Sequence, residues 1–207
     1  MDAKTEDAGP EMARVGVPMK TASGRMFWPL DPRPWEVSLD DIAHHLANIC
    51  RWGGSSRWHY SVAQHAALVA LELPRRLRKA ALLHDAAEAY LGDFIRPLKS
   101  AVWFGGRDEM VRSVAEVEEA ILRQVFLSLG VDWPVMVQWQ WIKKADEHVM
   151  AAEARALFEH DPAWVLHTDE FPPAKVVIER MIPEDAKALF LQTWRTCCYP
   201  AVPDCGG

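Results

Sequence analysis

A histidine–aspartate pair followed by a glutamate stands near the middle of the chain, in an apolar segment. His84 and Asp85 are adjacent, and Glu88 comes one helical turn later. A buried carboxylate is costly unless it is paired or binds a metal ion. Two further residues complete a set, His65 upstream and Asp146 downstream. Two imidazoles and two carboxylates form a mixed nitrogen and oxygen ligand set, which predicts a site for a divalent transition metal.

Helices are expected to position these residues, because apolar side chains recur with the helical period along most of the chain. The predicted helices span residues 39–50, 62–73, 74–92, 107–129, 134–156 and 184–195. His65 falls in the second of them, the His84–Asp85 pair in the third, and Asp146 in the fifth. Only residues 175–178 could equally form a strand or a helix. The pattern therefore predicts an all-α fold.

The length of 207 residues suits one domain with a sizeable core. Residues 1–18 are polar and are predicted to be a disordered leader. Residues 19–37 are rich in proline and aromatic residues. We expect them to form an extended arm that lies across the helices with its aromatic side chains packed down. The domain would then span residues 19–200, with a helical core over 38–160 and a C-terminal helix region over 161–200.

Composition limits the classes of partner. Half of the residues are hydrophobic and a quarter are charged, which is typical of a globular protein. The net charge of −6 argues against a broad surface for a nucleic-acid polymer. A small anionic substrate remains compatible, because a metal ion and a few arginines reverse the local potential. Neither a signal peptide nor a long apolar run is recognisable, so we expect a cytoplasmic protein without a membrane partner.

Several polar residues near the ligand set are candidates for substrate binding. Arg51 and Trp52 open a loop rich in Gly and Ser between two predicted helices, where binding groups are often placed. A guanidinium suits phosphate, and an indole can stack on a base. Asp93, Arg96 and Lys99 follow the end of the third helix. The alternatives are that the tryptophan belongs to the core and that Arg96 and Lys99 are solvated charges.

Two groups of acids have other predicted roles. Glu153 is seven residues after Asp146 and shares its helix face, so we expect it to orient the site from behind the ligands. Glu116, Glu118 and Glu119 are predicted to form an exposed face of the long fourth helix without a catalytic role.

The order of the four ligands, each in a helical context, resembles the HD-domain superfamily of metal-dependent phosphohydrolases. The segments that narrow this resemblance are Ser61–His65, His84–Glu88, Gly92-Asp93 and Pro97–Lys99. They look like the bacterial 5′-deoxynucleotidase branch and a group of phage and prophage hydrolases that includes dATP triphosphohydrolases. The resemblance runs from Met26 to about Ala156. It implies an HD-domain helical bundle preceded by the extended aromatic and proline-rich arm.

The resemblance also implies roles for individual residues. His65, His84, Asp85 and Asp146 would hold the metal, which would be Co, Mn or Zn, with Mg considered as a second ion. Glu88 would be the acid or base near the scissile phosphate. Asp93 would bind the sugar near its 3′-hydroxyl and disfavour a 2′-hydroxyl. Arg51 would contact phosphate or sugar, and Trp52 would pack beside the substrate. Because such relatives are oligomers, we expect a homo-oligomer.

Three functions remain open from the sequence. One is a 5′-nucleotidase that hydrolyses 2′-deoxynucleoside 5′-monophosphates, and another is a triphosphohydrolase (dNTPase) that releases triphosphate from a dNTP, with dATP favoured. The same set of metal ligands would serve both activities. The third is a degenerate HD module that binds a nucleotide without turnover. The presence of all four ligands together with Glu88 argues against that third reading. Hydrolysis of deoxynucleotides in nucleotide metabolism is therefore the expected function.

Overall fold

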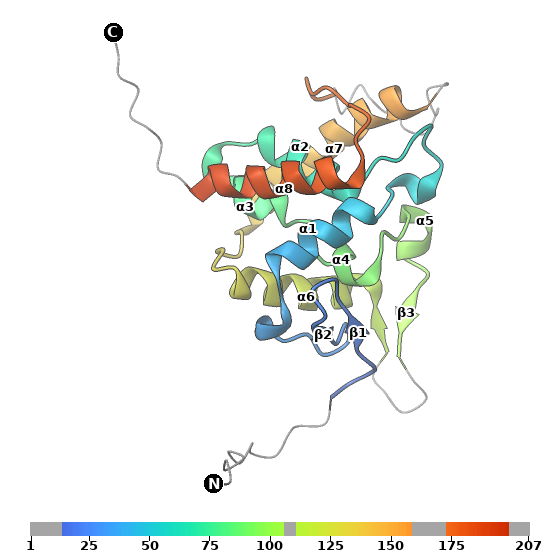
Figure 1. Ribbon diagram of the computed structural model, residues 1–207, viewed down its shortest axis with the longest axis vertical. Helices are drawn as coiled ribbons and strands as arrows, with labels where there is room; N and C mark the ends of the chain where they lie inside the picture. Colours follow the sequence, from blue (N-terminus) through green and yellow to red (C-terminus); the bar gives the residue numbers. More distant parts are fainter. Residues whose placement is uncertain (1–13, 106–110, 159–172, 199–207) are drawn as a thin grey trace.

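The computed structural model of the protein describes residues 14–105, 111–158 and 173–198. Within them the chain is mostly helical, as predicted, with two short antiparallel hairpins (Figure 1). The α-helices are α1 Leu39–Asn48, α2 Val62–Leu71, α3 Arg75–Leu82, α4 Glu88–Leu91, α5 Arg96–Lys99, α6 Val114–Ser128, α7 Met136–Leu157 and α8 Pro183–Cys198. The 3-10 helices are η1 Pro34–Glu36 and η2 Trp52–Gly54, and the strands are β1 Met19–Lys20, β2 Met26–Phe27, β3 Trp103–Phe104 and β4 Arg112–Ser113.

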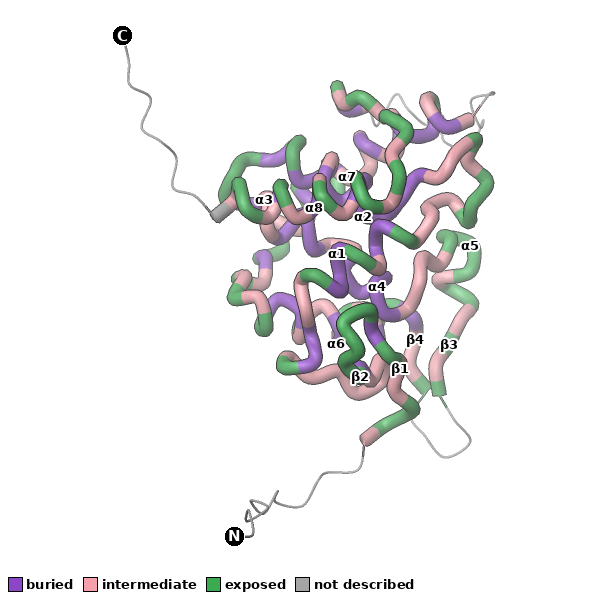
Figure 2. The backbone as a smooth tube through the Cα atoms, in the orientation of Figure 1, coloured by how far each residue is buried: buried purple, intermediate pink, exposed green. Residues whose placement is uncertain are grey.

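Helix α2 is the centre of the bundle, because its sequence is apolar around almost the whole circumference. Eight of its ten residues are buried. Helices α1, α3, α7 and α8 pack against it, and α8 runs across α1 and α2 in Figure 1. Figure 2 shows buried backbone where α1, α2 and α4 come together. The buried polar residues of α2 are Gln64 and His65, so the fold places one predicted ligand inside the core.

Contacts of the N-terminal arm with the bundle include one buried aromatic side chain and one buried acid. Phe27 of β2 is fully buried, and its ring stacks on Tyr90 of α4 with centroids 3.7 Å apart. Asp41 of α1 is also fully buried. Its carboxylate accepts hydrogen bonds from the Thr21 hydroxyl at 2.9 Å and the Ser23 backbone N–H at 2.7 Å. The arm therefore fixes α1 and α4 relative to each other.

The expectation that all the arm's aromatic side chains pack down is only partly correct. Trp28 is half-buried beneath the Arg14 guanidinium, which lies 4.0 Å from its ring centroid. Trp35, in contrast, is 68% exposed. Arg14 also forms an ion pair of 2.6 Å with Glu36, so it is tied to the arm. Residues 1–13 of the predicted leader lie outside the described residues.

Helix α6 begins later than the sequence predicted. The expected helix over 107–129 is wrong at its start, because β4 pairs with β3 just before Val114, with Trp103 opposite Ser113. Residues 106–110 lie outside the described residues. Ser113 caps the helix, and its side chain and that of Glu116 satisfy each other's backbone N–H groups in a capping box. The capping box marks where α6 begins, whereas the helical spacing of apolar residues continues before it.

The segment with the His84–Asp85 pair is not one continuous helix, which corrects the prediction of a helix over 74–92. Helix α3 ends at Leu82 and α4 begins at Glu88. Between them the backbone N–H groups of His84, Ala86 and Glu88 each bond to the carbonyl three residues earlier. These turns are tighter than those of an α-helix. Gly92 ends α4 with a φ of +81°, the left-handed conformation expected of a C-terminal cap.

The remaining predicted helices agree with the structure. Helix α7 lies close to the predicted 134–156, and α8 begins one residue before and ends three residues after the predicted 184–195. Residues 175–178 form neither strand nor helix. None of the helices in the described ranges combines the length and the apolar character that a membrane crossing requires.

Replacing Phe27 by alanine is expected to lower the free energy of unfolding by about 3–5 kcal/mol, because it empties a fully buried site beneath Tyr90. Chemical denaturation of the two proteins measures the difference. The matched control is Trp35→Ala in the same arm, which should change stability by less than about 1 kcal/mol because Trp35 is largely exposed. Equal losses in the two variants would contradict the anchoring role of Phe27.

Candidate metal centre

His65 is fully buried, and both of its ring nitrogens face carboxylates. Nδ1 lies 2.6 Å from Oε1 of Glu153, and Nε2 lies 3.1 Å from Oδ1 of Asp146. Glu153 is itself fully buried and accepts a hydrogen bond of 2.9 Å from the Tyr60 hydroxyl. A carboxylate that accepts a hydrogen bond from Nδ1 holds the proton there and leaves Nε2 to bind a metal. The predicted role of Glu153 behind the ligands agrees with this geometry.

His84 is oriented by the turn that it belongs to. Its Nδ1 lies 2.7 Å from the carbonyl oxygen of Ala81, which also accepts the backbone N–H of His84. Its Nε2 lies 3.2 Å from Oδ2 of Asp85. The Nε2 atoms of His65 and His84 are both buried and have no hydrogen-bond partner among the described residues. Buried polar atoms without a partner are rare, and a metal ion would satisfy both.

The fold brings the four predicted ligands together from three separate segments. One ligand atom from each of His65, His84 and Asp146 lies within 4.8 Å of the others, which is close enough for a shared ion. Asp85 lies beside this group, with Oδ2 3.6 Å from Nε2 of His65 and 3.2 Å from Nε2 of His84. Helix α2, the turn after α3 and helix α7 supply these residues. The residues present therefore fit a divalent transition metal.

Charges in the cluster shift its pKa values in opposite directions. Burial alone would lower the pKa of His84, but the neighbouring Asp85 carboxylate outweighs it and raises that pKa to about 9. Burial alone would raise the pKa of Asp146, but His65 lowers it to about 2. Burial would also raise the pKa of Asp85, but His84 and His65 hold that pKa far below its usual range. A proton on His84 thus offsets part of the carboxylate charge in the metal-free protein at neutral pH, and a metal would replace it.

Arg51 lies behind the ligand set. Its guanidinium is within 3.4 Å of Oδ2 of Asp85 and within 3.4 Å of Oε2 of Glu153. It therefore links one predicted ligand to the residue that orients His65. Burial would lower the pKa of Arg51, but the carboxylates of Glu153 and Asp85 raise it, so the group stays charged. The contact of Arg51 with a phosphate or sugar stays a prediction.

Trp52 has an unusual backbone conformation. Its φ is +60°, and the two glycines that follow it also have positive φ values. A bulky side chain rarely adopts this left-handed conformation, and such a residue costs about 1–3 kcal/mol of strain. The Trp52 ring meets the edge of the Phe158 ring with centroids 5.3 Å apart. The chain thus turns sharply straight after Arg51, and the predicted contact of Trp52 with a substrate is untested.

A small cavity lies beside the ligands. Its volume of about 30 Å³ has room for a water molecule or two. Its wall consists of His84, Asp85, Ala87, Glu88, Lys99, Glu118 and Leu122. Glu88 is only 3% exposed. Burial, followed by the charges of Asp85 and Asp93, raises the pKa of Glu88 well above its ordinary value. This shift favours the protonated form of Glu88 in the metal-free protein.

The predicted substrate-binding residues differ in their distance from this cavity. Lys99 borders it, and its Nζ lies 3.4 Å from Oε1 of Glu88. Asp93 is partly buried and close enough for its charge to act on Glu88. Burial raises the pKa of Asp93 itself, and Arg51 opposes that rise. Arg96 is exposed and is not part of the described cavity wall.

Glu118 is the residue that the sequence reasoning missed. It was expected on an exposed face with Glu116 and Glu119, and those two are exposed. Glu118, however, is only 18% exposed and lines the cavity. A signal for this was present, since Glu118 stands four residues after Val114 and four before Leu122, on the apolar side of α6.

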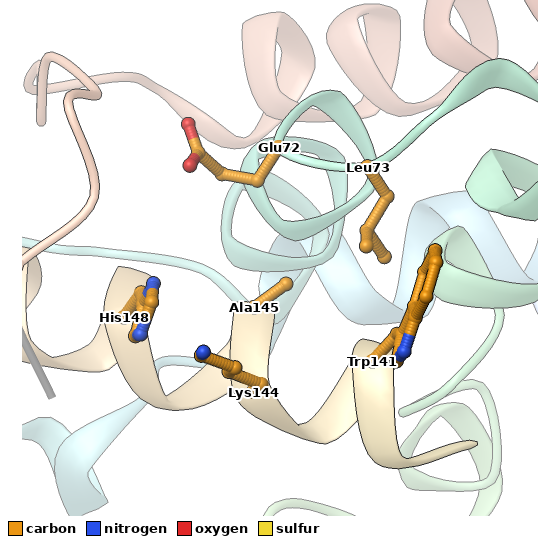
Figure 3. Close-up of a pocket in the computed structure, with 6 residues that line it drawn as sticks. All are labelled: Glu72, Leu73, Trp141, Lys144, Ala145 and His148. Atoms are coloured by element: carbon orange, nitrogen blue, oxygen red, sulfur yellow. The ribbon is translucent and has the colours of Figure 1, made fainter. Parts of the chain in front are cut away.

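A larger hollow of about 300 Å³ lies between the end of α2 and helix α7. It is lined by Glu72, Leu73, Trp141, Lys144, Ala145 and His148, and Figure 3 shows the α7 side chains directed towards Glu72 and Leu73. None of these six is a predicted site residue. The metal centre is thus separate from the larger hollow in the described part of the molecule.

Replacing Glu153 by glutamine should weaken Mn²⁺ binding by about 10–100-fold, because the charged acceptor that orients His65 becomes a neutral amide of the same size. Titration of the metal-free protein measures the affinity. Glu119→Gln on the exposed face of α6 makes the same chemical change away from the site. Unchanged affinity in folded Glu153→Gln protein would show that the negative charge of Glu153 does not support the ligand.

Metal affinity should rise with pH. The pKa of His84 is about 9 in the metal-free site, so at neutral pH a metal must displace this proton. The affinity for Mn²⁺ is expected to increase from about pH 6 and to level off above about pH 9. Calorimetry at pH 7.5 in buffers of different ionisation enthalpy should detect proton release. Binding without proton release would show that His84 is neutral before the metal arrives.

The raised pKa of His84 also determines how the stability of the metal-free protein changes with pH. The pKa of His84 is raised above its unfolded value, so its pairing with Asp85 stabilises the metal-free protein fully below about pH 6.5 and is lost as the pH rises through about 9.

Comparison with known proteins gives two relatives. The uncharacterized protein RCAP_rcc00048 of Rhodobacter capsulatus is 39% identical over 118 residues, which cover 53% of this chain and 56% of that protein. The chain thus matches little more than half the length of this relative. The uncharacterized protein YfdR of Escherichia coli is 35% identical over 139 residues, which cover 67% of this chain and 71% of YfdR. No family model matches the chain. On the extent of the second match, the chain belongs to the same protein family as YfdR.

Proposed function

We propose that this protein is an HD-type metal-dependent phosphohydrolase that acts on 2′-deoxynucleoside 5′-phosphates. One observation carries the proposal: two buried imidazole Nε2 atoms without hydrogen-bond partners among the described residues face the carboxylates of Asp85 and Asp146. Glu88, whose pKa is raised by burial and by the charge of Asp85, lines the adjoining cavity. Hydrolysis of a phosphate ester can use a bound metal ion with a carboxylic acid close to it.

His65, His84 and Asp146 would hold the ion, with Asp85 beside them. Co, Mn or Zn suits this mixture of imidazole and carboxylate ligands. When bound, the ion lowers the pKa of a coordinated water and offsets charge on the phosphoryl oxygens. Glu153 and the Ala81 carbonyl keep the two imidazoles in the orientation that leaves Nε2 available.

Glu88 is the proposed proton donor to the leaving oxygen. Its raised pKa favours the protonated form, and it lines the cavity together with His84 and Asp85. Lys99, 3.4 Å from Glu88, supplies a positive charge for the phosphate, and Arg51 adds to the local potential from behind Asp85. Asp93 is proposed to bind the sugar, in line with its closeness to Glu88 and with the family resemblance.

The cavity has room for water but not for a nucleoside. The base and sugar of a substrate would therefore lie outside it, where partly buried Asp93 and exposed Arg96 stand. Two alternatives follow from the same site. A dNTP triphosphohydrolase would use the same ligands with the phosphate chain placed differently, and a nucleotide-binding module would bind without turnover.

Product analysis tests the proposal. The protein is incubated with Mn²⁺, Co²⁺ or Zn²⁺ plus Mg²⁺ and with each dNMP and dNTP, and the products are separated by ion-pair chromatography. Nucleoside and phosphate from dNMPs would support the nucleotidase activity. Nucleoside and triphosphate from a dNTP would favour the alternative hydrolase. Bound metal without any product would reject both hydrolases.

Glu88→Gln is expected to keep the metal and the fold but to lower turnover of a deoxynucleotide by at least about 10²-fold, because the proton donor is gone. The loss on p-nitrophenyl phosphate should be much smaller, since p-nitrophenolate leaves without a proton. Metal content and both turnover rates are measured on the same preparation. Equal losses on the two substrates would reject the proton-donor role and point to a general disturbance of the site.

A further inference from the structure

Helix α6 contributes a charged residue to the metal centre, although it carries none of the predicted ligands. Glu118 and Leu122 of α6 form one side of the cavity, opposite the segment with His84, Asp85 and Glu88. Glu118 is only 18% exposed, whereas its neighbours Glu116 and Glu119 are exposed. A carboxylate that is largely buried on the apolar side of a helix indicates a partner inside the molecule.

That partner is Lys99. Its Nζ lies 2.9 Å from Oε1 of Glu118 and 3.4 Å from Oε1 of Glu88, so one ammonium is shared by two carboxylates. Burial would lower the pKa of Lys99, but both carboxylates raise it, and the group stays charged. The lysine side chain is 35% exposed, while that of Glu88 is 4% exposed. Lys99 thus lines the cavity and is also partly open to the solvent from which a phosphate would enter.

Glu118 is the nearer of the two carboxylates that contact Lys99. Lys99 ends the four-residue helix α5, in which no residue is buried. Leu98 of the same helix is 48% exposed, so apolar contacts do little to fix it. Without Glu118, the nearest described carboxylate would be Glu88, and the ammonium would pair with it alone. Such a pair would draw the ammonium towards Glu88 and withdraw its positive charge from the phosphate.

We propose that Glu118 is a positioning residue for the hydrolase: it holds the Lys99 ammonium at the mouth of the cavity, ready for a substrate phosphate, and keeps it from pairing only with Glu88. This inference rests on the proposed function, because it assigns the phosphate-binding side of that site. Glu118 acts through Lys99 and does not touch the reacting atoms.

A double-mutant cycle on the metal-loaded protein tests the coupling. Glu118→Gln should lower kcat for the preferred deoxynucleotide by about tenfold with less than about threefold change in KM. Glu118→Asp keeps the charge and should recover part of the loss. Adding Glu118→Gln to Lys99→Met should lower kcat by no more than about twofold further, because Glu118 acts only through the lysine. Equal losses in the two backgrounds would overturn the proposal.

A second measurement does not depend on turnover. Acetylation of individual lysines is followed by mass spectrometry in the Mn²⁺-loaded protein, with and without inorganic phosphate. Phosphate should slow acetylation of Lys99 in the wild type and protect it less in Glu118→Gln. Lys187, which pairs with Asp40 at 3.0 Å on another side of the bundle, is the control and should not respond.

The two measurements separate the two proposals. If no deoxynucleotide is hydrolysed, the proposed function fails, and the acetylation of Lys99 still decides the inference. Phosphate protection of Lys99 that depends on Glu118 supports it. Absence of protection in the wild type, or equal protection in Glu118→Gln, overturns it.

Discussion

The carboxylate of Glu153 is the constraint on which the metal centre depends. It is fully buried, and a buried charge is tolerated only when it is paired and hydrogen-bonded. Tyr60, His65 and Arg51 supply those partners from the loop before α2, from α2 itself and from the start of the η2 loop. Helix α7 is thereby joined to the central helix at the point where Asp146 must meet His65. The same contacts that stabilise the buried acid also set the orientation of a ligand.

The balance of charges in the site connects the buried Glu153 carboxylate to the proposed chemistry. Asp85, Asp146 and Glu153 bring more negative charge into the site than Arg51 alone offsets, and these carboxylates raise the pKa values of His84 and His65 in the metal-free protein. A metal ion would take over the role of the imidazole protons. Burial and the neighbouring carboxylates also raise the pKa of Glu88. The same surplus of buried carboxylates therefore favours a cation in the candidate site and the protonated form of Glu88.

Much of the fold and of the candidate site could be predicted from the sequence, because helical periodicity is a local property. The six helical segments, the central place of the ligand set and the role of Glu153 follow from spacing along single helices. The errors arose where the chain departs from one regular period. The break between α3 and α4 and the strand before α6 leave the apolar pattern undisturbed, so periodicity alone does not reveal them. Glu118 was misplaced because its neighbours Glu116 and Glu119 are exposed acids, although its own spacing from Val114 and Leu122 pointed inward.

The types and the order of the ligands, and the helices that carry His65 and Asp146, could be predicted from the residues alone, because they depend on residue identity and short-range spacing. The contacts of the folded chain were needed to show which nitrogen of each histidine faces the other ligands, that Arg51 joins Asp85 to Glu153, and that α6 lines the cavity. These facts depend on contacts between residues up to 102 positions apart, as for Arg51 and Glu153. Such contacts are set by how helices pack and where turns redirect the chain, and a difference of one residue in either would rotate a side chain out of the site.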